Sequence, residues 1–263
     1  NGVVFGRGAQ VNVGSLVAST ANVGNGDFMA GRLEFREPGK AGAGILNQGQ
    51  ITAAEGGLVA LVAPHVRNDG LIQARLGRVT LGAGDTFALD LYGDGLISLA
   101  VDPARAGAML DATGTTGAAG ATDATGATDA AGRPVTSLIA QAGRIEADGG
   151  RVVLVSAATA RSALDQVINL SGSVRADTVQ QQGGRIVLMA SGGTAQVSGN
   201  LSAQGPGAGQ SGGHIEVLGE RVHLTPGASI DASGTAGGGT VHVGGAYQGS
   251  GATARASATT VDA

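Results

Sequence analysis

Histidines are the side chains with the clearest potential for chemistry in this chain of 263 residues. Three of the four lie near the C-terminal end, namely His214, His223 and His242. Three imidazoles can in principle hold a metal ion such as Zn²⁺. No acidic or cysteine ligand accompanies them at ligand spacing, and an alternating strand turns such side chains toward solvent. The sequence therefore favours solvent-facing histidines and predicts no metal site.

Aspartates near residue 100 suggest a second kind of chemistry. Asp90, Asp94 and Asp102 could share acid and base roles, as two carboxylates do in β-helical enzymes that cleave polysaccharides. A sugar-binding cleft normally has aromatic platforms, however, and only Tyr92 is near. The Gly93-Asp94-Gly95 segment is like one unit of a calcium-binding repeat but occurs once. We interpret these aspartates as turn residues and predict no catalytic residue, no enzyme activity and no cofactor.

An internal repeat supplies the elements that must position any such side chain. Its pattern is an apolar residue, any residue, Ala, a variable gap, Gly, any residue, Val or Ile, any residue, and then Leu or Val. The first apolar position is occupied by Ile51, Ile72, Ile145, Val174, Leu201 and Ile230. The second apolar position, after the gap, is occupied by Val59, Val79, Val152, Ile186, Ile215 and Val241.

Both halves of the pattern alternate apolar with polar or small residues, which is the period of a β-strand. Apart from the 73 residues between the second and third copies, consecutive copies lie 21 to 29 residues apart. This step is too short for a four-stranded propeller blade, and the copies contain no helical half. The pattern predicts an all-β parallel β-helix, or β-solenoid, with coils of roughly 20–30 residues. In such a fold, equivalent strands stack about 4.8 Å apart and the twelve apolar positions face inward.

Glycines precede the first apolar position in all six copies. Gly49, Gly70, Gly143, Gly172 and Gly199 stand two residues before it, and Gly227 stands three residues before it. A coil must turn sharply between strands. These glycines are therefore expected to adopt the positive φ angles that other residues resist.

Arginines recur at one outward position of the pattern. Arg78, Arg151 and Arg185 share this position with Leu58, His214 and Thr240. Stacked coils would align the arginines as a partial basic stripe. Because outward charges discourage lateral association of sheets, we favour this interpretation over an anion or glycan contact.

The composition agrees with a thin, repetitive core, since the chain has 49 Gly, only six aromatic residues and no Cys. Disordered chains combine low hydrophobicity with high net charge, whereas this chain is 42% hydrophobic with a net charge of −4. No apolar run approaches the roughly 18 residues of a membrane-spanning helix, and no basic run indicates nucleic-acid binding. The chain begins at Asn1 without a signal-peptide pattern, so we expect a fragment or a processed product.

The first hundred residues carry an ordered set of short segments. They include Asn1-Gly2-Val3-Val4-Phe5-Gly6, residues 9–20, and Asp27-Phe28-Met29-Ala30-Gly31-Arg32. These segments resemble the latter part of the secretion domain of filamentous-haemagglutinin-type exoproteins. Residues 47–53 and 56–61 resemble the repeats that follow that domain, as do residues 83–85, 89–91 and 95–98.

The resemblance implies a two-partner (type Vb) secretion system of a Gram-negative bacterium. It implies export through an outer-membrane β-barrel translocator and folding outside the cell as a right-handed β-helix. Asn1 and Gly2 match the end of the family's Asn-Pro-Asn-Gly signature, which implies a part in recognition by the translocator. The absence of Cys is compatible with this route, because a disulfide would obstruct threading.

Four regions are predicted: residues 1–46 as the C-terminal part of the secretion domain or the first coils, 47–103 as coils, 104–134 as one long low-complexity mobile loop, and 135–263 as further coils of the same solenoid. The expected function is the β-helical shaft of a secreted, cell-surface adhesin that contacts a host or neighbouring-cell receptor or glycan. The same shaft could instead carry a contact-dependent inhibition toxin or a haemolysin. A β-helical polysaccharide-active enzyme is a further alternative, and self-association into fibres stays open.

Overall fold

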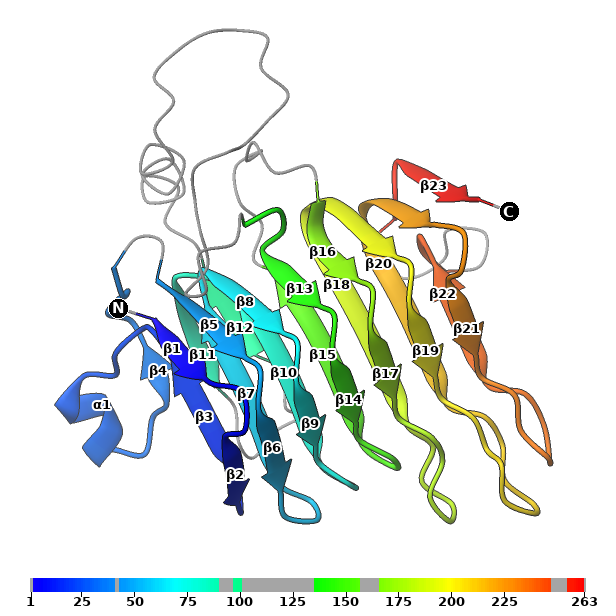
Figure 1. Cartoon of the computed structure of the whole chain (residues 1–263), viewed down its shortest axis with the longest axis horizontal. Helices are drawn as coiled ribbons and strands as arrows, with labels where there is room; N and C mark the ends of the chain where they lie inside the picture. The colour runs from blue at the N-terminus through cyan, green and yellow to red at the C-terminus, as the bar shows by residue number, and fades with distance from the viewer. Residues whose placement is uncertain are drawn as a thin grey trace, which may run out of the picture.

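β-Strands, mostly parallel, are the main secondary structure of the described chain (Figure 1). The computed structural model describes residues 2–40, 43–89, 97–100, 135–156, 166–246 and 255–262. The helix in this part of the chain is α1 (Asn25–Met29). No helix of the described residues is long and apolar enough to cross a membrane. The predicted all-β class is therefore confirmed, whereas the loop predicted at 104–134 lies outside the described residues.

The parallel strands form three rows, in which equivalent strands of successive repeats pair with one another. The first row contains β1 (Val3–Phe5), β5 (Gly44–Asn47), β8 (His65–Asn68), β13 (Ile139–Gln141), β16 (Gln166–Leu170), the second halves of β18 (Arg185–Val197) and β20 (His214–Leu224), and β23 (Ala258–Val261). The second row contains β2 (Gln10–Val13), β6 (Gln50–Ala53), β9 (Leu71–Gln73), β14 (Arg144–Glu146), β17 (Ser173–Arg175), β19 (Asn200–Ser202) and β21 (Ser229–Asp231). The third row contains β3 (Leu16–Ser19), β7 (Leu58–Ala63), β10 (Arg78–Ala83), β15 (Arg151–Ser156), the first halves of β18 and β20, and β22 (Thr240–Val243). Because each repeat adds one strand to each row, the arrangement is consistent with a β-helix.

The twelve apolar positions of the repeat lie in two continuous ladders. In the second row, Ile51, Ile72, Ile145, Val174, Leu201 and Ile230 pair in that order. In the third row, the order is Val59, Val79, Val152, Ile186, Ile215 and Val241. The first five members of each ladder are at most 1% exposed. Ile230 is partly buried, and Val241 is 42% exposed on β22, which pairs only with β20 among the described strands.

The first row contributes a buried polar ladder to the interior. Asn47, Asn68 and Gln141 are in register and each is 0% exposed. Asn47 Nδ2 donates to Asn68 Oδ1 at 2.7 Å, and Asn68 Nδ2 donates to Gln141 Oε1 at 2.8 Å. Asn47 Oδ1 also accepts from the backbone N–H of Gly49 at 3.1 Å. The side-chain amides therefore bond neighbouring strands inside the core as the backbone does between them. Each amide needs such a partner, because an unpaired buried amide would be costly.

Asn68→Leu is expected to lower the free energy of unfolding by about 2 to 4 kcal/mol, because it keeps the volume but leaves the buried Asn47 donor and Gln141 acceptor without partners. Chemical denaturation of the purified chain measures this loss. Gln50→Leu is the matched control, since the Gln50 amide bonds Gln73 on the exposed face. Equal stability of the two variants would contradict a role for the buried ladder.

The glycines before each first apolar position have a different role from the one expected. Of the six, only Gly227 has a positive φ, at 91°. The others lie where two repeats approach closely: a Cβ at Gly70 would lie 2.1 Å from the carbonyl oxygen of Gly49. A Cβ at Gly143 would meet Gly70 O at 2.1 Å, and one at Gly172 would meet Gly143 O at 2.1 Å. The expectation of positive φ was thus wrong for five of these glycines, because contact between repeats, and not turn conformation, excludes a side chain.

A small antiparallel sheet covers the N-terminal end of the third row. It contains β4 (Glu34–Phe35), β11 (Thr86–Leu89) and β12 (Ile97–Ala100). The Phe35 and Phe87 rings stack with centroids 4.2 Å apart. Phe87 and Val62 belong to one small buried cluster. Residues 3–19 add the first strand to each row, so the non-repeating part of the predicted 1–46 region begins after β3.

Candidate functional site

Of the two residues that the resemblance connects with translocator recognition, Gly2 lies at the start of the first row, and Asn1 lies outside the described residues. Gly2 immediately precedes β1 and packs against the next repeat, since a Cβ at Gly2 would lie 2.4 Å from Gly44 O. Gly2 therefore allows β1 to pair closely with β5.

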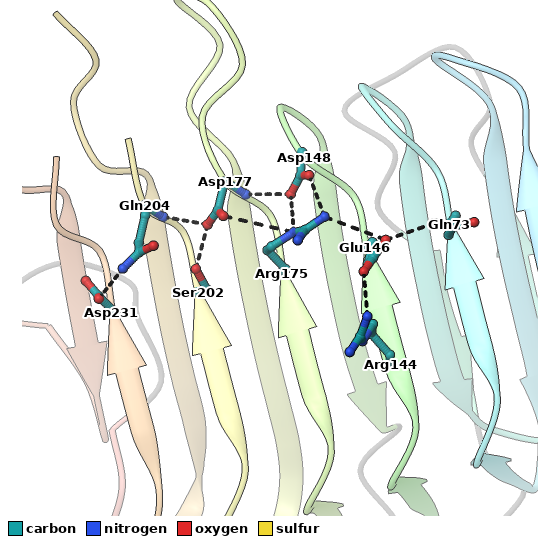
Figure 2. A network of polar contacts seen from close by, with 9 residues as sticks. All are labelled: Gln73, Arg144, Glu146, Asp148, Arg175, Asp177, Ser202, Gln204 and Asp231. Carbon is teal, nitrogen blue, oxygen red and sulfur yellow. Dashed lines mark hydrogen bonds and ion pairs between the residues drawn. The ribbon is translucent and has the colours of Figure 1, made fainter. Parts of the chain in front are cut away.

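A polar network crosses the outer face of the second row (Figure 2). Gln73, Glu146, Arg175, Ser202 and Asp231 occupy one outward position on successive strands. Gln73 Nε2 donates to Glu146 Oε2 at 2.9 Å, and Glu146 lies 3.6 Å from Arg175 Nη2. The outer face therefore links at least two successive repeats through side chains as well as through the backbone.

Arg175 is the centre of this network. Its guanidinium lies 3.0 Å from Asp148 Oδ2 and 4.0 Å from Asp177 Oδ2, in addition to the contact with Glu146. Partial burial opposes ionisation of Arg175, but the hydrogen bond with Asp148 and the charges of Asp148, Glu146 and Asp177 raise its pKa. Three carboxylates therefore converge on one face, although the repeat pattern predicted no such cluster. Asp148 and Asp177 were missed because they lie in the turns after β14 and β17, outside the pattern.

These carboxylates act as hydrogen-bond acceptors that link repeats. Asp177 Oδ1 accepts from Ser202 Oγ at 2.6 Å and from the backbone N–H of Gln204 at 2.8 Å. Asp231 accepts from the backbone N–H of Ser233 and from the Gln204 amide, and mainly the Ser233 contact lowers its pKa. A general acid needs a carboxyl whose pKa is raised, so the lowered pKa of Asp231 does not suit that role.

A groove of about 340 Å³ lies beside the C-terminal end of the network. Its lining residues are Gln204, Gly205, Pro206, Ser233, Gly234 and Thr235, and none of them is aromatic. The groove thus lacks the platforms on which sugar rings stack. The aspartates first considered for catalysis, Asp90, Asp94 and Asp102, lie with Tyr92 outside the described residues.

Arg175→Ala is expected to reduce the free energy of unfolding by about 1 kcal/mol, because it leaves three carboxylates without their shared cation on a half-exposed surface. The loss should shrink in about 1 M NaCl, where the Debye length is about 3 Å. Arg144→Ala is the control, since Arg144 is 64% exposed in its side chain and contacts only Glu146 within the network. Denaturant titrations at low and high salt measure both variants, and equal losses would contradict a central role for Arg175.

The predicted arginine stripe is present on the third row. Arg78, Arg151, Arg185 and His214 occupy one outward position in consecutive strands. Arg185 forms an ion pair with Glu216, since its Nη2 lies 2.9 Å from Glu216 Oε2. The stripe is therefore partly neutralised where it reaches β20.

The histidines are distributed differently from the expectation. His214 and His242 both contact Glu216: His214 Nε2 is 3.0 Å, and His242 Nδ1 is 3.8 Å, from Glu216 Oε1. His223 instead contacts Asp262 at 2.7 Å, and His65 is buried at the start of β8. The expectation that no acidic ligand accompanies the histidines was wrong, because strand pairing brings Glu216 to His242 from 26 residues away in the chain.

Glu216 is held as a carboxylate in this cluster. Burial by itself would raise its pKa, but the contacts with His214 and Arg185 outweigh burial and hold the pKa below its usual value. The side chains of His214, Glu216 and His242 are 27%, 12% and 28% exposed. The cluster is therefore half-buried, whereas the sequence suggested solvent-facing histidines.

Comparison with known proteins places these features in a family. The family model described as the TPS secretion domain matches residues 1–203, so the match continues well past the predicted boundary at residue 46 and through most of the repeats. The crystal structure of the HMW1 secretion domain from Haemophilus influenzae is similar over 99% of this chain, with a TM-score of 0.75 and 27% sequence identity. This chain spans 60% of the length of that protein chain. No curated protein matches. The chain belongs to the family of TPS secretion domains, the domains of two-partner secreted exoproteins.

Proposed function

We propose that this chain directs the export of an exoprotein from a Gram-negative bacterium through an outer-membrane β-barrel translocator. The match of residues 1–203 to the TPS secretion domain carries this proposal. The similar structure from Haemophilus influenzae is also a secretion domain. In this proposal the translocator is the partner during export, and the product is extracellular or held at the cell surface.

We further propose that the chain folds outside the cell as a right-handed parallel β-helix. The support is the order of its three rows, in which each strand pairs with strands of the preceding and following repeats. A repeat in such an arrangement is stabilised mainly by its neighbours, so folding can propagate one repeat at a time as the chain emerges. The chain has no Cys, so no disulfide would have to pass the translocator.

The proposed role of the folded chain is the β-helical shaft of a cell-surface adhesin, with no catalytic site of its own. This proposal is supported by the contacts of the outer polar residues, because Arg175, Asp177 and Asp231 bond other repeats and not a ligand site. The groove beside them has no aromatic lining residue. Contact with a receptor or glycan, and any fibre formed by several shafts, would then depend on the complete exoprotein.

Co-expression of the full-length native gene with its candidate translocator tests the export proposal. The exoprotein is expected in the medium or on the cell surface with the translocator, and inside the cell without it. An unrelated outer-membrane β-barrel expressed to the same level is the control. Equal release in all strains, or retention in all of them, would overturn the proposal.

The adhesin role needs a separate measurement. Cells that display the complete exoprotein are expected to bind host or neighbouring cells, and purified chain 1–263 should release no reducing ends from a panel of polysaccharides. Lysis or growth inhibition of target cells without adhesion would favour the haemolysin or toxin alternative. Polysaccharide cleavage by the purified chain would contradict the absence of a catalytic site.

A further inference from the structure

The cluster of His214, Glu216 and His242 departs from the repeat at one place on the third row. Glu216 is in register with Val187 of the preceding repeat and with His242 of the next one. Val187 is in turn in register with Val153. Val153 and Val187 are 9% and 4% exposed. A carboxylate therefore replaces a run of buried valines, and the two imidazoles adjoin it.

The donor atoms of the three side chains converge. One ring nitrogen of His214, one ring nitrogen of His242 and a Glu216 carboxylate oxygen all lie within 4.8 Å of one another. The two imidazole rings meet edge to face, with centroids 5.5 Å apart and planes at 89°. In a tetrahedral site with bonds of 2.0–2.1 Å, donor atoms are separated by about 3.3 Å. The contacts of 3.0 and 3.8 Å from Glu216 Oε1 lie on either side of this value.

The ring nitrogens that face Glu216 are buried. His214 Nε2 and His242 Nδ1 are both inaccessible to solvent, and His242 Nδ1 has no hydrogen-bond partner. Donor atoms of one ion lie close together in this way, because their lone pairs point at a common position. A buried ring nitrogen without a partner is otherwise costly.

Arg185 prepares the carboxylate for such a role. Its Nη2 donates to Glu216 Oε2 at 2.9 Å, whereas the two imidazoles contact the other oxygen, Oε1. Groups that orient a ligand in this way are usual around metal sites. Arg185 acts here as a positioning residue.

We propose that His214, Glu216 and His242 bind one divalent transition-metal ion, with Zn²⁺ as the ion that best suits this donor set. Two imidazoles and one carboxylate are typical Zn²⁺ ligands, and three protein donors leave a fourth position for water or another ligand. The ligands come from β20 and β22, so the ion links two successive repeats and binds only after both have folded. This proposal does not depend on the route of export.

Isothermal titration of Zn²⁺ into the untagged, chelator-treated chain 1–263 tests the site. We expect one Zn²⁺ per chain and slower backbone hydrogen exchange of β22 when the ion is present, with β9 unchanged. His242→Ala and His214→Ala should each weaken binding more than about 100-fold, since even supporting residues outside the ligand shell contribute 10- to 100-fold. His223→Ala should bind like the unmodified chain, because His223 lies on the same strand but contacts Asp262.

His242→Cys distinguishes a ligand from a residue needed for packing, because a thiolate also binds Zn²⁺. This variant should recover most of the affinity that His242→Ala loses, and circular dichroism of the zinc-free variants should show unchanged strand content. X-ray absorption at the zinc edge should show two imidazoles and light oxygen donors. Binding that persists in both alanine variants, binding lost equally in His223→Ala, or no binding to the folded chain would each overturn the proposal.

Discussion

Val152→Asp is expected to unfold the repeats on both sides of β15. Val152 is 0% exposed and stacks between Val79 and Ile186, which are equally buried. A carboxylate at this position would lose its hydration without gaining a cation or a donor. The expected cost is at least about 4 kcal/mol, a range reached mainly by unpaired buried charges and large cavities. Since each repeat is stabilised by its neighbours, the loss should spread along the rows. Thermal melting followed by circular dichroism, together with limited proteolysis, measures it.

A pair of adjacent residues provides the control for this prediction. Leu201 is 1% exposed in the second-row ladder, whereas Asn200 is exposed one position earlier on the same strand. Leu201→Asp should be as damaging as Val152→Asp, and Asn200→Asp should change the stability by no more than about 0.5 kcal/mol. Similar melting temperatures of Leu201→Asp and Asn200→Asp would contradict the inward register of the ladder.

Gly143→Ala is expected to have the second largest effect, although it adds a single methyl group. The new Cβ would lie 2.1 Å from Gly70 O and 2.6 Å from Asp69 C, and both atoms belong to the backbone. Gly70 O also accepts the hydrogen bond from the backbone N–H of Arg144 at 2.8 Å. The neighbouring repeat cannot move away without stretching that pairing. We expect a loss of about 3 kcal/mol in the free energy of unfolding, the size of a severe overpacking effect.

Gly14→Ala is the control for Gly143→Ala. A Cβ at Gly14 would meet nothing within 4 Å, and its φ is not positive. Alanine there should leave stability unchanged or raise it by about 0.5 kcal/mol, because it restricts the unfolded chain. Denaturant titrations measure both variants. An equal loss in the two would mean that general glycine flexibility, and not close approach, explains the glycines of the repeat pattern.

The repeat was visible in the sequence because strands impose a period of two on every side chain they contain. Ile51, Ile72 and Ile145 could be placed on one inward ladder from that period alone, and their register in the structure agrees. The buried amides of Asn47, Asn68 and Gln141 could not be found in the same way. An amide inside a strand has the same period as a solvent-facing one, and only its partners show that it is buried.

Sites formed between repeats were the hardest to predict. Asp148, Asp177 and Arg175 meet because β14 and β17 pair in register and the backbone after them stays aligned, with the Gly149 N–H donating to Asp177 O. Glu216 and His242 meet because β20 and β22 pair in one register. These residues lie outside the repeat pattern or at positions that differ from one copy to the next, so the pattern alone does not show their contacts.

The sequence by itself determined the strands, the size of the repeat and the direction in which its apolar side chains face. These properties depend on near neighbours in the chain and on the alternation of side chains along an extended backbone. Only the tertiary structure decided why Gly143 must lack a side chain, which amides are buried, and that His214, Glu216 and His242 share one place. Those outcomes depend on distances of a few ångströms between repeats, and such distances are set when one strand takes its register against the next.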